Sequence, residues 1–207
     1  MFVFNCININ HSLLLKLDKE AFLSFLIGIF GYILYFIYDL NQVFNFSKLA
    51  KSVFGIGSIL VIVGTLWECS LNIQSYLGII IAIIGIIAEI YILFFALDFN
   101  DTYVDGRFKV CDKGVYALCR HPGFYSFLLI YIGLYIAYQN QTFLYIMLLY
   151  NGLNILYIIF QDVFVFPRLF EDYGAYKNTT TFLLINKQGL TRCINDFRGK
   201  QWNLKIS

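Results

Sequence analysis

Five apolar stretches dominate the chain, and short polar connections separate most of them. They cover residues 21–38, 53–67, 76–97, 124–138 and 142–160. A helix that crosses a bilayer needs about 20 apolar residues, within a range of about 17–25. The third stretch meets this length, whereas the second and fourth are short and need their flanking residues. The pattern predicts an all-α membrane helical bundle with about five transmembrane helices.

Polar residues gather in two further regions of the chain. Residues 98–122 carry Asp, Asn, Lys and Arg throughout, and residues 161–207 form a polar C-terminal segment. The chain shows no internal repeat and no low-complexity run, so we expect one membrane domain over residues 1–207. Within it we expect N-terminal helices in 21–97, a second region in 98–184 and a polar tail in 185–207.

The composition favours a membrane protein over a soluble domain. Hydrophobic residues make up 59% of the 207 residues and charged residues 14%, whereas soluble domains have about 45–50% and about 25%. The net charge is only +2 and no basic stripe interrupts the apolar runs, which argues against a nucleic-acid partner. The five cysteines form no CxxC pair and there are two histidines, so we expect no metal site and no disulfide framework.

The basic residues predict an orientation, because Lys and Arg are enriched in cytoplasmic loops. If the C-terminus is cytosolic and five helices span the membrane, 13 of the 15 basic residues fall on the cytosolic side. Only Lys16 and Lys19 fall on the other side. The polar regions 98–122 and 161–207 then share one side of the membrane, where they can meet and enclose a site.

One short segment combines charge, a helix breaker and a membrane boundary. In Arg120-His121-Pro122, an arginine and a histidine precede a proline where the polar region becomes apolar. Proline suits the first turn of a helix, where its missing N–H leaves no hydrogen bond unmade. Arg120 and His121 should therefore lie at a helix N-terminus, which favours anions. Charges near bilayer depth usually face a cavity or a partner, so an anion site competes here with a plain interface anchor.

At these residues the chain resembles the isoprenylcysteine carboxyl methyltransferase-like membrane enzymes, whose relatives include the phospholipid N-methyltransferases. The segment 114–124, GVYALCRHPGF, is similar to the GxY…RHPxY segment of that family. A tight hairpin connection at 139–141 follows, and Gln161-Asp162 then stands in the place of the family's acidic pair. The YxxYK segment 173–177 and a short apolar run come next. The resemblance covers residues 99–184, and it implies that the region 98–184 is a methyltransferase-like catalytic region.

The resemblance implies an S-adenosylmethionine-dependent methyltransferase with S-adenosyl-L-methionine as its cofactor. The implied reaction is carboxyl O-methylation of a prenylated cysteine or a related lipid-linked acceptor that approaches from the lipid bilayer, in an endoplasmic reticulum membrane. The implied catalytic residues are Arg120, His121 and Asp162. The implied cofactor-binding residues are Arg107, Phe108, Lys109, Val110, Tyr116, His121, Pro122, Gly123, Phe124, Gln161 and Asp162.

Three positions depart from the family's pattern and keep alternatives open. Phe124 stands where the family has tyrosine, and Gln161 replaces the first acid of the pair. Tyr157 replaces the basic residue that would hold the carboxylate of a prenylcysteine substrate. The alternatives are a phospholipid N-methyltransferase and a homologue that keeps the fold without turnover. A steroid-reductase-like NADPH enzyme also carries an RHP-type turn, but residues 127–138 lack the acid and tryptophan that such enzymes have there.

Two features of the apolar stretches allow more than one interpretation. Glu89 lies inside the third stretch, where it serves either function or helix packing. Five glycines are expected to permit close helix packing rather than to bind a cofactor; they are Gly55, Gly57, Gly64, Gly78 and Gly85. The sequence does not indicate an oligomeric state.

Overall fold

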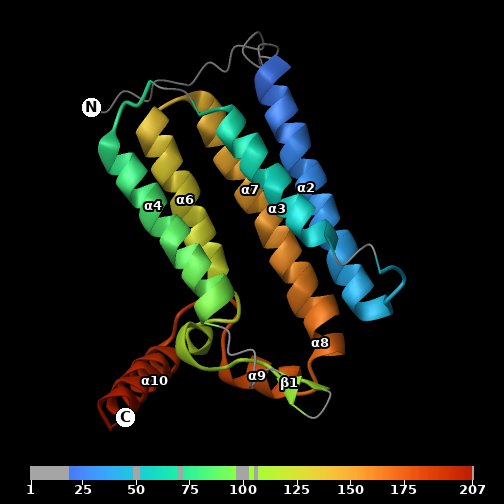
Figure 1. The fold of residues 1–207 in the computed structure, drawn as a ribbon, viewed down its shortest axis with the longest axis vertical. Coiled ribbons are helices and arrows are strands. Elements are labelled where there is room, and N and C mark those ends of the chain that lie inside the picture. The colour runs from blue at the N-terminus through green and yellow to red at the C-terminus, as the bar shows by residue number, and fades with distance from the viewer. Residues whose placement is uncertain (1–18, 49–51, 70–71, 97–102, 105–106, 207) are drawn as a thin grey trace, which may run out of the picture.

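The apolar helices lie side by side and form a bundle (Figure 1). The computed structural model describes residues 19–48, 52–69, 72–96, 103–104 and 107–206. The bundle helices are α2 (Lys19–Phe44), α3 (Val53–Trp67), α4 (Tyr76–Ile90), α6 (Gly123–Tyr138) and α7 (Gln141–Phe160). Each of them coincides with one of the five apolar stretches, so the prediction of a helical membrane-type protein is confirmed at this level.

Three segments of the described chain are long and apolar enough to cross a membrane. They are Phe22–Phe44, Tyr76–Phe95 and Gln141–Leu169. Helices α3 and α6, with 15 and 16 residues, fall below that length. The number of spans predicted from the sequence is therefore supported for three helices, and five spans stay a prediction.

Two of the long segments continue beyond their α-helices through π-helical turns. Helix α4 continues as the π-helix η2 (Tyr91–Phe95), and α7 continues as the π-helix η4 (Gln161–Val165) and the short α8 (Phe166–Leu169). The helical segment that begins with α7 therefore ends at Leu169, nine residues past position 160, where the fifth apolar stretch ends. Single π-helical turns inside helices occur frequently at functional sites.

Close approach of helix backbones holds α4 against α6 and α2 against α3. A side chain at Gly78 or Gly133 would collide with backbone atoms of the opposite helix, and so would one at Gly31 or Gly57. Gly85 and Gly64 are also closely packed, as expected from the sequence. Gly55 is different, because a Cβ atom there would meet nothing within 4 Å.

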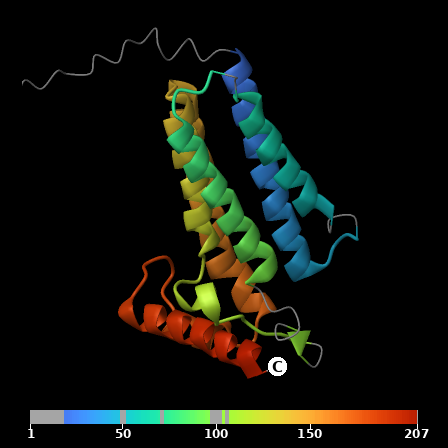
Figure 2. The ribbon, with the colours of Figure 1, turned by 60° about the vertical axis from the view of Figure 1, so that its left-hand side comes forward.

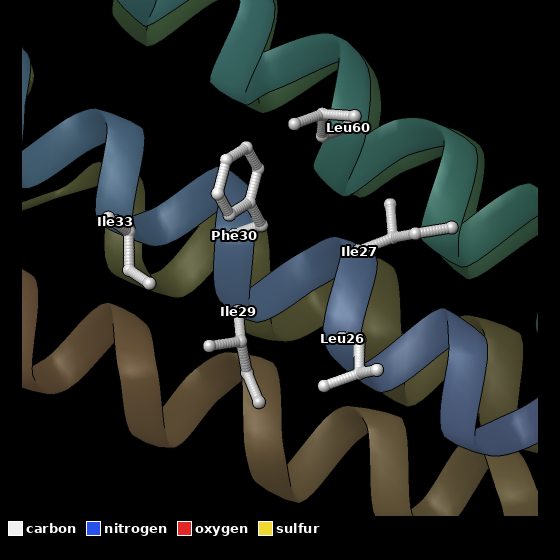
Figure 3. A pocket seen from close by; sticks show the side chains of 6 residues that line it. All are labelled: Leu26, Ile27, Ile29, Phe30, Ile33 and Leu60. Carbon is white, nitrogen blue, oxygen red and sulfur yellow. The ribbon is translucent and has the colours of Figure 1, made fainter.

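Tyrosines fill the centre of the bundle and find hydrogen-bond partners there. The Tyr150 hydroxyl donates to the backbone oxygen of Ser24 over 2.8 Å, and the Tyr131 and Thr65 hydroxyls lie 2.7 Å apart. The outer face is apolar: Figure 3 shows a shallow hollow at α2 and α3 that is lined only by Leu26, Ile27, Ile29, Phe30, Ile33 and Leu60. An apolar surface of this kind suits contact with lipid chains.

The remaining described elements lie at one end of the bundle, where α4 and α7 end and α6 begins (Figures 1 and 2). They are the hairpin of β1 (Tyr103–Val104) and β2 (Arg107–Phe108), the 3₁₀-helix η3 (Gly114–Ala117), α9 (Tyr173–Thr179) and α10 (Lys187–Ile206). The hairpin is the sole departure from an all-helical fold in the described part of the chain. The polar regions 98–122 and 161–207 therefore meet, as the sequence predicts.

Candidate functional site

Asp162 lies at the centre of a buried polar cluster. The π-helical turn η4 carries it at the end of α7, and its carboxylate is almost fully buried. Its oxygen Oδ1 accepts hydrogen bonds from Arg120 Nε at 2.7 Å and from the Tyr173 hydroxyl at 2.5 Å. Its oxygen Oδ2 lies 3.2 Å from both Arg120 Nη2 and Lys177 Nζ. A buried carboxylate is stable only when paired and hydrogen-bonded in this manner.

Arg120 joins the polar region 98–122 to the C-terminal segment. Its backbone N–H donates to the Thr181 oxygen over 2.9 Å, and its Nη1 donates to the Thr180 oxygen over 2.8 Å. Its guanidinium also lies 5.6 Å from the centre of the Phe182 ring. Arg120 is thus fully engaged within the protein, and it holds residues 180–182 against Asp162.

His121 is buried beside this ion pair and has an unpartnered ring nitrogen. Only 7% of the residue is exposed, and its ring stacks on Phe166 and meets Phe182 edge-on, with centroid distances of 5.8 and 5.1 Å. Its Nε2 lies 3.6 Å from Asp162 Oδ1, too far for a hydrogen bond, and no other residue of the described chain hydrogen-bonds to it. Burial lowers the pKa of His121 below its usual range, against the opposing pull of Asp162. The ring is therefore neutral at pH 7.

Two neighbouring groups keep their protons in this environment. Burial, and then the hydrogen bond to Asp162, raise the pKa of Tyr173 well above its usual range, so its hydroxyl stays a donor. Burial raises the pKa of Cys119 to about 11. A thiol with such a pKa is a poor nucleophile at pH 7, so Cys119 serves packing rather than covalent chemistry.

The start of α6 has an acidic neighbour within the protein itself. Pro122 caps this helix, as the sequence predicts, and Gly123 is its first residue. A Cβ atom at Gly123 would lie 3.6 Å from both carboxylate oxygens of Glu89 in α4, and the Ser126 hydroxyl donates to Glu89 Oε2. A carboxylate beside a helix N-terminus is stabilised by the helix dipole. The packing role that the sequence allows for Glu89 is therefore realised, and a catalytic role stays a prediction.

The other predicted cofactor-binding residues lie in three different parts of the structure. The β2 strand contains Arg107 and Phe108, whose side chains lie outside the described residues, and Lys109 is exposed. The Val110 N–H donates to Asp172 Oδ1 over 3.0 Å, and the Tyr116 hydroxyl donates to the Ile92 oxygen over 3.2 Å. Phe124 packs against the apolar core of the bundle. Among the predicted residues whose side chains the structure describes, Arg120, His121 and Asp162 form one contact cluster, with Pro122 and Gly123 next to them in the chain.

Gln161 points to a different partner from its neighbour Asp162. Its Nε2 donates to Asp39 Oδ2 in α2 over 2.9 Å. Asp39 is buried, with 4% of the residue exposed. Gln161, one of the positions that depart from the family pattern, thus holds a carboxylate that α2 supplies.

Sequence reasoning missed three participants of these clusters. The first apolar stretch ends at residue 38, so the sequence places Asp39 just outside the predicted helix. In the structure α2 continues past it to Phe44. Tyr173 and Lys177 were seen as part of a motif without an assigned role. Their spacing of four residues, which places two side chains on one helix face, was the available signal that both contact the same group.

The comparisons with known proteins give a family for the chain. No curated protein and no solved structure matches it. A family model matches residues 32–180, a range that runs from α2 through α9 and includes Asp39, Arg120, His121 and Asp162. The chain therefore belongs to the family described as "Protein of unknown function (DUF1295)".

Proposed function

We propose that this protein is a membrane methyltransferase that uses S-adenosylmethionine and acts on a lipid or lipid-linked acceptor. One observation carries the proposal: Arg120 and His121 meet Asp162 and the 173–182 segment in one buried cluster. This is the set of segments on which the resemblance to membrane methyltransferases rests. The family found by comparison, a family of membrane-associated proteins, is itself related to steroid-reductase-like and methyltransferase-like proteins.

The residues of the cluster fit such a cofactor through His121. Its buried Nε2 has no hydrogen-bond partner among the described residues, and buried polar atoms are normally hydrogen-bonded, so this nitrogen is available to a polar group of a bound molecule. The neutral ring can donate to or accept from the cofactor's polar groups. The rings of Phe166 and Phe182 beside it offer apolar surface to an adenine.

Arg120 and Asp162 serve this site as positioning residues. Because each already satisfies the other, neither is free to bind the cofactor directly, which changes the direct role that the resemblance implies for Asp162. Their pair fixes the π-helical turn against the start of α6 and holds residues 180–182 across His121. A rigid, water-poor site of this kind is what alignment of two reacting groups requires.

The chemistry asks little more of the protein than binding and alignment. S-adenosylmethionine supplies a methyl group already activated by its sulfonium. The chain's own residues hold the cofactor, orient the acceptor and exclude water. A carboxylate acceptor needs no base at pH 7, whereas an amine must lose a proton.

The charges inside the bundle favour an amine acceptor over a carboxylate. In the described bundle segments from 22 to 165 the acids are Asp39, Glu89 and Asp162, and those segments contain no Lys or Arg. Asp162 is paired with Arg120 and Lys177, whereas Asp39 and Glu89 have only neutral hydrogen-bond partners. A carboxylate acceptor finds no cation to pair with in these segments, whereas an ammonium can pair with either acid. Phospholipid N-methylation is therefore the better-supported acceptor chemistry, ahead of carboxyl O-methylation of a prenylated cysteine.

Methyl transfer in vesicles separates these possibilities. The purified protein is reconstituted with methyl-labelled S-adenosylmethionine and either an amine phospholipid or a prenylcysteine lipid, with phosphatidylcholine alone as the blank. We expect label in the amine phospholipid and none after an Asp162→Asn substitution. Label in the prenylcysteine lipid alone would reverse the choice of acceptor. No label in any lipid, with a wild-type protein that binds the cofactor, would identify a homologue without turnover.

A further inference from the structure

Helix α10 is docked on the rest of the protein by one of its faces. Arg192 Nη2 donates to the Thr179 oxygen over 2.8 Å and to Thr180 Oγ1 over 3.0 Å, and Asp196 Oδ2 accepts from the Gly114 N–H over 2.8 Å. Gly189 has no side chain at a point where a Cβ atom would collide with the Ala117 oxygen. Residues 189, 192 and 196 follow the spacing of one helix face. The contacts therefore fix the rotation of α10 about its axis.

A second face of α10 exposes large apolar side chains. Leu190, Ile194 and Phe197 are exposed to 48%, 42% and 42%. Their spacing of four and three residues places them in one row, which we call the α10 apolar stripe. The stripe lies about 100° around the helix from the docked face, because Leu190 and Phe197 each directly follow a docked residue. Leu184 and Ile185, in the segment that leads into α10, are also exposed.

The position of α10 places this stripe near the end of the bundle. Figure 2 shows α10 running across that end rather than continuing along the bundle axis. The leading segment is tied to the first turns of α6, because the Tyr125 hydroxyl donates to the Leu183 oxygen over 2.6 Å. If the bundle spans a membrane, α10 and Leu184–Ile185 therefore lie at the level of one membrane surface.

The charge of α10 indicates what covers the stripe. The helix carries five basic residues, Lys187, Arg192, Arg198, Lys200 and Lys205, and one acid, Asp196. A helix with an apolar row and an excess of Lys and Arg is typical of segments that lie in the interfacial layer of a bilayer. The negative surface of the cytoplasmic leaflet attracts such basic segments. Charge complementarity thus favours anionic lipid as the partner.

We propose that α10 lies in the headgroup layer, with Leu190, Ile194 and Phe197 in the acyl boundary and with Lys187 and Arg198 on anionic lipid. The docking of α10 also affects the Asp162 cluster. Arg192 binds the Thr179 oxygen, and Arg120, which pairs with Asp162, binds the oxygen of the next residue, Thr180. A lipid-seated α10 therefore clamps the C-terminal segment over His121. The proposal does not depend on methyl transfer, and it holds for any activity of the site.

The test uses the full chain with a single tryptophan on the stripe. Trp67 and Trp202 are replaced by Phe, and Phe197→Trp or the matched control Asn195→Trp is introduced. Asn195 is exposed and lies about 100–160° around α10 from the three residues of the stripe. The protein is reconstituted in vesicles of phosphatidylcholine, with or without phosphatidylglycerol, that carry bromine near the headgroup or deep in the acyl chains.

We expect the tryptophan at 197 to emit at shorter wavelength than the one at 195 and to be quenched more strongly by shallow bromine than by deep bromine. Phosphatidylglycerol should strengthen this quenching, and Lys187→Gln with Arg198→Gln should remove the increase. Equal, weak quenching at 195 and 197 would overturn the proposal. Quenching of the tryptophan at 197 that weakens as the protein-to-lipid ratio rises would also overturn it, because a second copy of the chain, rather than lipid, would then cover the stripe.

Discussion

Asp162 shows how strongly a single carboxylate can organise this protein. Its bidentate pair with Arg120 is buried, whereas the side chain of Lys177, which also contacts it, is 37% exposed. Removal of one partner from a buried ion pair typically costs about 3–5 kcal/mol, whereas exposed ion pairs contribute about 0–1 kcal/mol. The two contacts of one carboxylate therefore differ greatly in their expected effect.

This difference gives a prediction with an internal control. Asp162→Asn should lower the free energy of unfolding by about 3–5 kcal/mol, because it leaves the guanidinium of Arg120 buried and uncompensated. Lys177→Gln should lower it by about 0–1 kcal/mol. Chemical unfolding of the purified protein in detergent measures both. Similar effects of the two substitutions would contradict the buried geometry of the Arg120–Asp162 pair.

His121 makes stability depend on pH in a definite direction. Its pKa in the folded protein lies below the ordinary value of 6.5 because of burial, so on acidification the unfolded chain takes up its proton first. The contribution is complete above pH 6.5 and is lost as the pH falls from 6.5 towards the folded-state pKa. Unfolding measured between pH 5 and 8 should show this loss, and His121→Gln should reduce it. An unchanged pH profile in that variant would contradict the burial of a neutral ring.

At the residue scale, the sequence indicated the right groups and some of the wrong contacts. Arg120, His121 and Asp162 meet as the resemblance implied, although 41 residues separate His121 from Asp162 in the chain. Gln161 was expected at the same site, yet it turns to Asp39. Two adjacent residues on a helical segment point about 100° apart, so they reach different partners, and a sequence motif does not specify which.

At the element scale, the apolar runs predicted the five bundle helices but not where they end. Helix α2 continues to Phe44 and the α7 segment continues through η4 to Leu169, because polar residues extend a helix when tertiary partners satisfy them. Asp39 and Asp162 are such residues. The π-helical turn η4, which carries Asp162, has no signature in the hydrophobic pattern. Tertiary contacts of this kind cannot be read from local sequence.

The glycines of the α4–α6 contact provide a prediction at this scale. Gly78→Ala and Gly133→Ala should each destabilise the protein by about 1–3 kcal/mol, because the new methyl group meets the backbone of the opposite helix. Gly152→Ala in α7 is the matched control, since a Cβ atom there meets nothing within 4 Å. It should be neutral or stabilise by about 0.5–1 kcal/mol. Thermal unfolding in detergent ranks the three, and destabilisation by Gly152→Ala equal to that of Gly78→Ala would refute the packing argument.

At the scale of the whole molecule, the bundle gathers its chemistry at one end. The Asp162 cluster, the start of α6, η3, α9 and α10 all lie there (Figures 1 and 2). We propose that all five helices span the membrane, with flanking residues extending the short α3 and α6. From the distribution of Lys and Arg along the sequence we also propose that this end is cytosolic. The endoplasmic reticulum membrane stays a prediction from the resemblance.

The orientation can be tested in cells with reporters on the full chain. A fluorescent protein that matures only in the cytosol should be bright when it is fused after Ser207. The same reporter inserted between Gln139 and Gln141, in the connection of α6 and α7, should be dark. A bright signal at both positions would contradict the proposal that α6 and α7 each cross the membrane.

The binding of labelled S-adenosylmethionine to the purified full chain tests the central claim most directly. We predict saturable binding by the wild type that S-adenosylhomocysteine displaces, loss of binding in His121→Ala, and unchanged binding in Tyr145→Phe, an exposed position near the other end of the bundle. A folded wild-type protein that binds no cofactor at millimolar concentration would contradict the proposed function. Equal binding by the wild type and His121→Ala would contradict the placement of the site.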